Sequence, residues 1–213
     1  FITKLDSLDY FKKIYFSIMI IPVVLSSLYL AAFTITENVT SLTGGPVHWH
    51  ADYQVWTCGE RLDLVDPRGV SNKIGTTTFH EHDDDRIHIE GTINNLEDVD
   101  LDNYFEVIGG HLHEAEFVYP TNEGIISYKS GDLCTNGEVG TLKVYVNGKR
   151  MRDVEDYVIY PNQNVPPGDC IIIEFSPEES ETTDKLCNGW AANGWNYDSF
   201  HRREVKIGGN VWN

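Results

Sequence analysis

The sequence predicts a mainly β domain of β-grasp-like or β-sandwich arrangement, with one short helix, that follows an N-terminal transmembrane helix. Three observations support this fold class: a long apolar run near the start, a series of short alternating segments separated by turn residues, and one segment with helical spacing. The chain has 213 residues, and the part beyond the apolar run has the length of one domain.

The apolar run covers residues 14–35 and contains no charged residue. At about 1.5 Å per residue it would span roughly 33 Å, enough to cross a bilayer core, and a proline is tolerated there. We expect a retained signal anchor instead of a cleaved signal peptide, because the run is long for the latter. Lys4, Lys12 and Lys13 precede it, so the N-terminus is predicted to be cytoplasmic and the main domain extracytoplasmic.

The predicted organisation has five parts: a cytoplasmic N-terminus (1–13), a transmembrane helix (14–35), a linker (36–46), a β-rich, histidine-rich domain (47–186) and a C-terminal extension rich in Trp, Asn and Gly (187–213). Lysines and acidic residues cancel before residue 41, so the exterior part carries the whole net charge of −17. That charge argues against nucleic acid or anionic lipid as a partner. It suits cation binding, a basic partner or a saline exterior, and it would also simply keep the domain soluble.

The first predicted strands follow one another between residues 50 and 90. Residues 50–58 alternate and form a hairpin with residues 61–64. Residues 66–77 are rich in Gly, Pro, Ser and Asn and are predicted to form a loop. Residues 79–82 and 86–90 are predicted to be two short strands joined by a turn of three aspartates.

The middle of the domain contains the predicted helix. Apolar residues recur at three- and four-residue spacing over residues 95–109, which predicts one amphipathic helix, or a shorter one of two turns over 102–107. Short strands or loop are expected at 117–119 and 124–128.

The last predicted strands are the clearest. Residues 140–151 form a hairpin around Asn147-Gly148, the preferred pair for a type I′ turn. Further strands are predicted at 156–160 and 170–175, and the second of these reads as a central strand because it is continuously apolar.

All four cysteines lie on the predicted exterior side: Cys58, Cys134, Cys170 and Cys187. An even number there favours two disulfides, and three pairings are open. The absence of a Cys-x-x-Cys motif makes a thiolate zinc site or a thioredoxin-like site a poor interpretation.

Seven of the eight histidines fall in closely spaced motifs: His48-x-His50, His80-x-His82, His88 and His111-x-His113. Residues at i and i+2 share one face of a strand, so each pair presents two imidazoles side by side. Imidazole is a common ligand of zinc and of copper. We therefore predict a copper or zinc site at His48, His50, His80, His82 and His88, with Asp52 or Glu90 as a fourth ligand or as an acceptor that orients an imidazole.

Other metal chemistry is less well supported. His111 and His113 are predicted either to form a second, weaker site or to lie in solvent. The only methionines are Met19, inside the apolar run, and Met151, which argues against a blue-copper electron carrier.

No enzyme motif accompanies the histidines: the chain has no Gly-x-Ser-x-Gly, no His-Glu-x-x-His and no phosphate loop. The sequence thus favours a non-enzymatic metal-binding protein. One alternative is an accessory subunit of a larger membrane complex, of respiratory or monooxygenase type, or of a surface assembly. The expected partners are then other subunits of that complex or further copies of this chain. Another is a metal-dependent enzyme with an open coordination position. Trp190, Trp195 and Trp212 in the extension would either dock a partner or pack back on the domain.

Several motifs together resemble a known family. These are His-Trp-His-Ala-Asp-Tyr at 48–53, His-Glu-His-Asp at 80–83, Arg-Ile-His-Ile-Glu at 86–90 and Val-Tyr-Val-Asn-Gly at 144–148. Over about residues 47–176 the chain resembles uncharacterised, membrane-anchored extracytoplasmic proteins of archaea and of bacteria such as the Chloroflexi. The chain departs from that pattern at Asp52, where the family often has a third histidine. The resemblance implies a shared metal-like site and no particular reaction.

Overall fold

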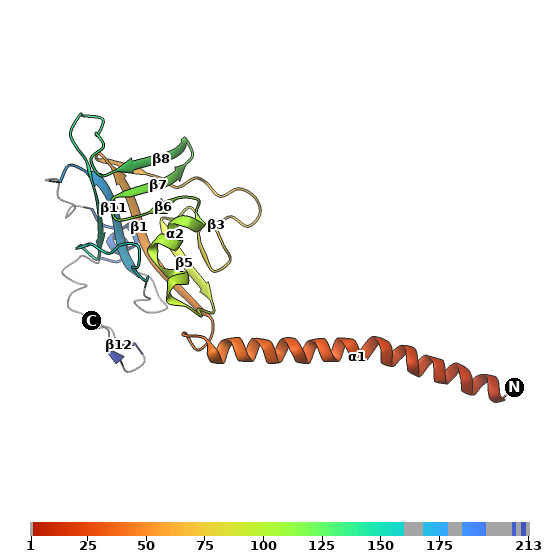
Figure 1. The fold of residues 1–213 in the computed structure, drawn as a ribbon. Helices are drawn as coiled ribbons and strands as arrows, with labels where there is room; N and C mark the ends of the chain where they lie inside the picture. The colour runs from red at the N-terminus through yellow and green to blue at the C-terminus, as the bar shows by residue number, and fades with distance from the viewer. Residues whose placement is uncertain (1, 160–167, 179–184, 195–205, 208–209, 212–213) are drawn as a thin grey trace.

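The computed structural model describes residues 2–159, 168–178, 185–194, 206–207 and 210–211. A single long helix, α1 (Ile2–Thr40), leads into a β-rich domain and projects away from it (Figure 1). The predicted fold class is confirmed: the domain is mainly β, with few and short helices.

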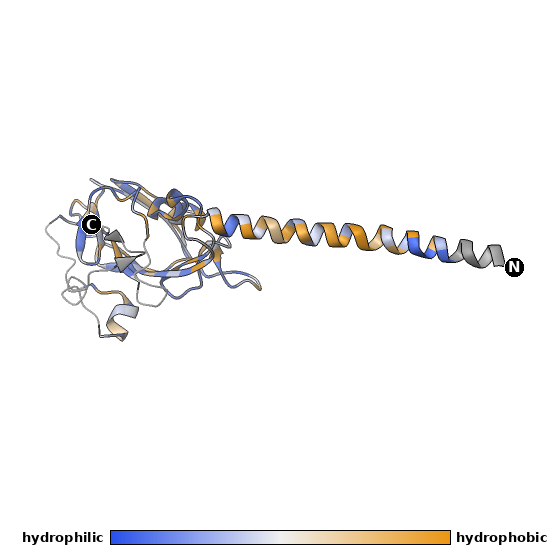
Figure 2. Cartoon of the chain, turned by 90° about the horizontal axis from the view of Figure 1, so that it is seen from below, coloured by the Kyte–Doolittle hydropathy of each residue, from blue (hydrophilic) through white to orange (hydrophobic). Residues whose placement is uncertain are grey.

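Helix α1 is long and apolar enough to cross a membrane over Asp9–Thr40. The apolar side chains of this span are largely exposed, and the colouring in Figure 2 shows that apolar residues predominate along the middle of the helix. The helix continues through residues 36–40, which were expected to be linker, because no glycine or proline interrupts the chain there. It ends just before Gly44 and Gly45, both of which have positive φ.

The main sheet contains eight strands in the order β10-β9-β11-β1-β5-β4-β3, with β2 also paired to β1. Its strands are β1 (Val47–Thr57), β2 (Glu60–Leu62), β3 (Ile74–Gly75), β4 (Phe79–Glu81), β5 (Arg86–Gly91), β9 (Thr141–Val146), β10 (Lys149–Met151) and β11 (Asp169–Ser176). The hairpins predicted at both ends of the domain are present, and Asn147 and Gly148 have the positive φ values that a type I′ turn needs.

The remaining strands form two small sheets: β6 (His111–Leu112), β7 (Glu116–Thr121) and β8 (Gly124–Lys129) in one, and β12 (Lys206–Ile207) and β13 (Asn210–Val211) in the other. The first of these is formed by strands that are consecutive in the chain.

Strands β1 and β11 are the parallel pair at the centre of an otherwise antiparallel sheet. Strand β11 is buried along its whole length, which confirms its predicted central position. The parallel pair requires a long connection between the two strands, and that connection contains α2 and the three-stranded sheet. This mixed topology distinguishes the domain from a sandwich of purely antiparallel sheets.

The two faces of β1 have different roles. Ala51, Tyr53 and Val55 point into the main core, where residues of β11 and the short helix meet them. The alternate residues, among them His48 and His50, point to the opposite face. The histidines therefore lie on the outer side of the sheet, with a rigid core behind them.

The predicted helix is shorter than the full 95–109 segment. A 3₁₀ turn, η1 (Leu96–Val99), precedes helix α2 (Leu101–Val107), close to the shorter alternative. Asp100 separates the two because it is extended and its carboxylate accepts a hydrogen bond from the backbone N–H of Asn103. Aspartate prefers this capping position to a helix interior.

The strand predicted at 156–160 is wrong over the residues described. Residues 156–159 form only one isolated bridge, between Asp100 and Val158. Their backbone instead follows η1 and the start of α2: Leu101 donates to the carbonyl of Tyr157, and Ile159 donates to that of Val99. Tyr160 lies outside the described residues.

The four cysteines pair as Cys58–Cys134 and Cys170–Cys187. The second disulfide ties the start of the C-terminal extension to the central strand β11. Directly after it, the short helix α3 (Asn188–Ala192) packs against the outer face of β1. Residues 185–194 therefore belong to the domain structurally.

Candidate metal centre

Three adjacent strands bring the histidines into one row. In the register of the sheet, His50 of β1 lies opposite His88 of β5, and His88 lies opposite His80 of β4. His48 is two residues from His50 on the same face, and His82 follows β4 directly. The spacing in the sequence and the strand order together put five imidazoles on one patch.

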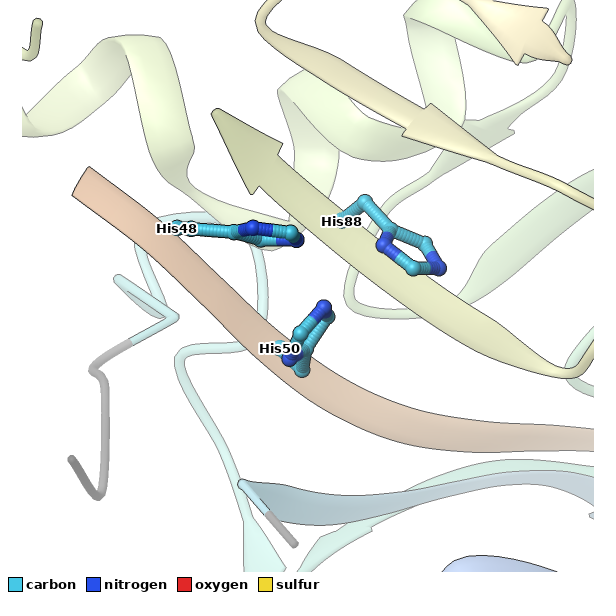
Figure 3. Close-up of side chains that lie close together, drawn as sticks. All are labelled: His48, His50 and His88. Carbon is cyan, nitrogen blue, oxygen red and sulfur yellow. The ribbon is translucent and has the colours of Figure 1, made fainter. Parts of the chain in front are cut away.

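The ligand atoms converge in two groups of three. His48, His50 and His88 offer nitrogens that all lie within 4.8 Å of one another, and so do His80, His82 and His88. Figure 3 shows the first group, with His48 and His50 from β1 facing His88 on β5. His88 belongs to both groups. We call the first the outer set and the second the inner set.

The two sets differ in exposure. The side chain of His48 in the outer set is 59% exposed, whereas His80 in the inner set is 1% exposed. The shared His88 lies between these extremes, with a side chain 12% exposed. A ligand arriving from solvent would therefore meet the outer set first.

Hydrogen bonds on three rings decide which nitrogen is open. Nε2 of His48 lies 3.2 Å from the Glu90 carboxylate, and Nε2 of His88 lies 3.3 Å from that of Asp84. Nδ1 of His82 lies 2.5 Å from the carbonyl oxygen of Asn72. Because these oxygens accept, the contacting nitrogens carry the protons. The opposite nitrogens, Nδ1 of His48 and His88 and Nε2 of His82, keep their lone pairs for a metal.

The remaining two rings contain buried nitrogens with no hydrogen-bond partner, Nδ1 of His50 and Nδ1 of His80. An unpaired buried polar atom is costly, and native structures rarely leave one without a reason. A cation bound with His48 and His88 would satisfy the atom on His50, and one bound with His82 and His88 would satisfy the atom on His80. This observation fits a metal at the row better than a set of structural histidines, which would be paired with protein groups.

Electrostatics keep two rings neutral. Burial, followed by the neighbouring His88, lowers the pKa of His50 to about 4. Burial, followed by Lys73, lowers the pKa of His80 to about 4. Both imidazoles are therefore uncharged at pH 7, the form in which imidazole binds metals.

The two predicted carboxylates have different positions. Glu90 contacts His48 and so occupies the position of an orienting acceptor. Asp52 does lie on the histidine face, but it is 3% exposed and accepts a 2.6 Å hydrogen bond from Nε of Arg86. Burial raises the pKa of Asp52 in spite of that contact. Neither carboxylate belongs to the converging groups among the described residues.

The second predicted histidine pair is placed apart from the first. His111 and His113 stack with ring centroids 4.9 Å apart. Their nearest carboxylates are Glu116, 3.9 Å from His111, and Glu155, 3.4 Å from His113. In the described part of the chain this pair joins no group of three converging ligands, so a second site there stays a prediction.

The predicted turn of three aspartates is present, but sequence reasoning missed how Glu81 supports it and how it orients His88. The buried carboxylate of Glu81 accepts hydrogen bonds from the backbone N–H groups of Asp83, Asp84 and Asp85. Asp83 and Asp85 have positive φ, and the resulting turn places the Asp84 carboxylate on His88. The run of three aspartates was visible in the sequence, but it gave no sign of which carboxylate would face an imidazole.

Of the two alternatives for Trp190, packing back on the domain is the one observed, and docking of a partner by this side chain is not supported. Trp190 is fully buried in its own domain, beside the Cys170–Cys187 disulfide and Ile172. Its indole N–H donates to the carbonyl oxygen of Gly168 at 2.9 Å. The disulfide fixes α3 on the sheet, so the side chain completes a small core there. Trp195 and Trp212 lie outside the residues whose side chains are described.

Each group offers three imidazole nitrogens that could hold a metal ion. The four cysteines are all in disulfides and offer no thiolate. Comparisons with protein-family models, with curated proteins and with solved structures found no match for this chain. The family resemblance described above therefore remains a prediction from the motifs.

Proposed function

We propose that this chain is a membrane-anchored, extracytoplasmic metal-binding protein that holds copper or zinc through His48, His50, His80, His82 and His88, and that it acts without catalysis. The single observation behind the proposal is the convergence of these rings from three neighbouring strands, with two buried nitrogens that have no partner. Capture or delivery of the ion fits this arrangement.

The choice of metals follows from the ligand type. Imidazole nitrogen suits zinc and copper, whereas calcium and magnesium prefer oxygen. Copper(II) would bind more tightly than zinc to the same nitrogens. The acidic surface of the domain, with a chain net charge of −17, would raise the local concentration of either cation.

The location is supported by the anchor and the disulfides. Helix α1 is long enough to cross a membrane, and disulfides persist in oxidising compartments outside the cytoplasm. His48 follows the last residue of α1 by eight positions, so its Cα lies within roughly 28 Å of the end of that helix. The lysines before the apolar run would keep the N-terminus inside.

The test is metal binding by the detergent-solubilised full chain, measured by equilibrium dialysis against zinc(II) and copper(II). We expect tight binding by the natural sequence and its loss when all five histidines of the row are replaced by alanine. His111→Ala/His113→Ala is the matched control, since it removes another His-x-His pair and should keep the ion. Equal loss in both variants, or no binding by the natural sequence, would refute the proposal. Circular dichroism establishes that the variants fold.

A further inference from the structure

The outer and inner sets share one ligand, and the hydrogen bond on that ligand restricts how many ions they can hold. His88 contributes to both sets. Its Nε2 lies 3.3 Å from the ionised Asp84 carboxylate, which leaves Nδ1 as its open nitrogen. One lone pair binds one ion, so the two sets compete for His88.

Simultaneous occupation of both sets would need a bridging ring. His88 would have to give up its bond to Asp84, lose its single ring N–H proton and bind, as an imidazolate, one ion through each nitrogen. The two divalent ions would then repel each other at short range. The structure instead shows the Asp84 bond formed and supported, because Glu81 holds the backbone of that turn at three N–H groups.

The two sets differ in how far their imidazoles are exposed to solvent. In the outer set, His48 is 59% exposed, so ions can exchange with solvent or with a carrier. In the inner set, His80 is 1% exposed, so an ion there is better shielded from water. Each set contains one unpaired buried nitrogen, on His50 or on His80, so the difference between the sets is exposure.

We propose that the five histidines are two overlapping ligand sets for one ion, which passes from the outer to the inner set while His88 stays bound. This inference rests on the proposed function and specifies its mechanism. The bonds to His48 and His50 break as bonds to His80 and His82 form. The ion keeps its charge and at least one imidazole, so it never leaves the protein during the exchange.

The experiment compares ion stoichiometry and release in the full chain, with zinc(II) as the probe and a colorimetric chelator as the acceptor. The forms are the natural sequence, His48→Ala/His50→Ala, His80→Ala/His82→Ala and His88→Ala. We expect one ion per chain in the first three. His88→Ala should weaken binding by more than the roughly 10–100-fold that loss of an orienting partner costs.

The rates of zinc release test the proposed direction of transfer, from the outer to the inner set. His80→Ala/His82→Ala keeps the exposed set, so it should release zinc faster than the natural sequence. His48→Ala/His50→Ala keeps the buried set and should both load and release more slowly. The reverse order would overturn the assignment of outer and inner sets. The control His111→Ala/His113→Ala should match the natural sequence in every measurement.

Failure of this inference is distinct from failure of the proposed function. Two ions per chain that both remain in His111→Ala/His113→Ala would replace the shared arrangement by a bridged pair, and metal binding itself would stand. Complete loss of the ion in either double variant, with the fold intact by circular dichroism, would indicate one fixed site and would also overturn the handover. If the natural chain binds no ion, the proposed function itself is refuted.

Discussion

Individual hydrogen bonds decide which nitrogen is open to a metal in three of the five imidazoles, those of His48, His82 and His88. The His-x-His spacing was enough to predict which rings share a face, because the side-chain period of a strand is two. It was not enough to predict that Asp84 and Asn72 would hold protons on His88 and His82. Those partners lie in turns whose positions depend on tertiary structure, and strand periodicity contains no information about them.

The Asp84 contact leads to the first prediction. Asp84→Ala removes the acceptor for Nε2–H of His88 and should weaken metal binding by roughly 10–100-fold, the usual cost of losing such a partner. Stability of the metal-free chain should change little, since Asp84 is half exposed. Asp83→Asn is the control, because asparagine tolerates the positive φ of Asp83 and the Asp83 contact with Glu81 uses its backbone N–H. Equal affinities in the two variants, measured by competition with a chelator, would contradict the orienting role.

The two neutral rings predict how stability depends on pH. Burial lowers the pKa of His50 and of His80 to about 4, while unfolded histidine titrates near 6.5. Between these values the unfolded chain binds more protons than the folded one. The metal-free chain should therefore be most stable above about pH 6.5 and lose stability as the pH falls towards 4.

His80→Gln removes one of these titrating groups, so its melting temperature should fall less steeply over the same pH range. His111→Gln provides the comparison at an exposed histidine. If the melting temperature of the natural chain rises on acidification from pH 6.5 to 4.5, the predicted direction of the pH dependence of stability is wrong.

At the scale of elements, the order of the strands brings the histidines of three separate motifs together on one face of the sheet. The sequence predicted each strand that carries a histidine of the row, but β4, β5 and β1 become neighbours only through the sheet register. Propensity failed at 156–159, where apolar residues that read as a strand pack beside the α2 segment instead. The sequence did not decide between the three possible disulfide pairings, because the pairing depends on which elements lie next to one another in the fold.

Helix α3 allows a test of how the C-terminal segment packs on the histidine face. A Cβ on Gly189 would lie 2.0 Å from Oδ2 of Asp52 and 2.6 Å from Nη2 of Arg86. Gly189→Ala should therefore destabilise the chain, although alanine is favoured over glycine in a helix by up to about 1 kcal/mol. We expect a net loss of about 1–3 kcal/mol, typical of overpacking, from denaturant unfolding.

The matched control for that substitution is Ala191→Gly, at an exposed position of the same helix. It should cost no more than about 1 kcal/mol, because only helix propensity changes. Stabilisation by Gly189→Ala would mean that α3 does not pack on the Asp52–Arg86 pair.

At the scale of the whole molecule, an acidic, histidine-rich domain follows one long apolar helix. If α1 spans the bilayer, alkaline carbonate washing of membranes should leave the full chain in the pellet, because extraction would expose its apolar surface to water. Release into the supernatant would mean that the helix does not span. A peripheral protein in the same membranes supplies the positive control for release.

The central claim is that imidazoles from the row on β1, β5 and β4 bind a transition metal. X-ray absorption spectroscopy of the full chain loaded with one equivalent of zinc(II) or copper(II) tests it most directly, because outer-shell scattering identifies imidazole rings. The account predicts at least three imidazole nitrogens at about 2.0 Å and no sulfur. A shell of oxygens alone, without the imidazole signature, would contradict it.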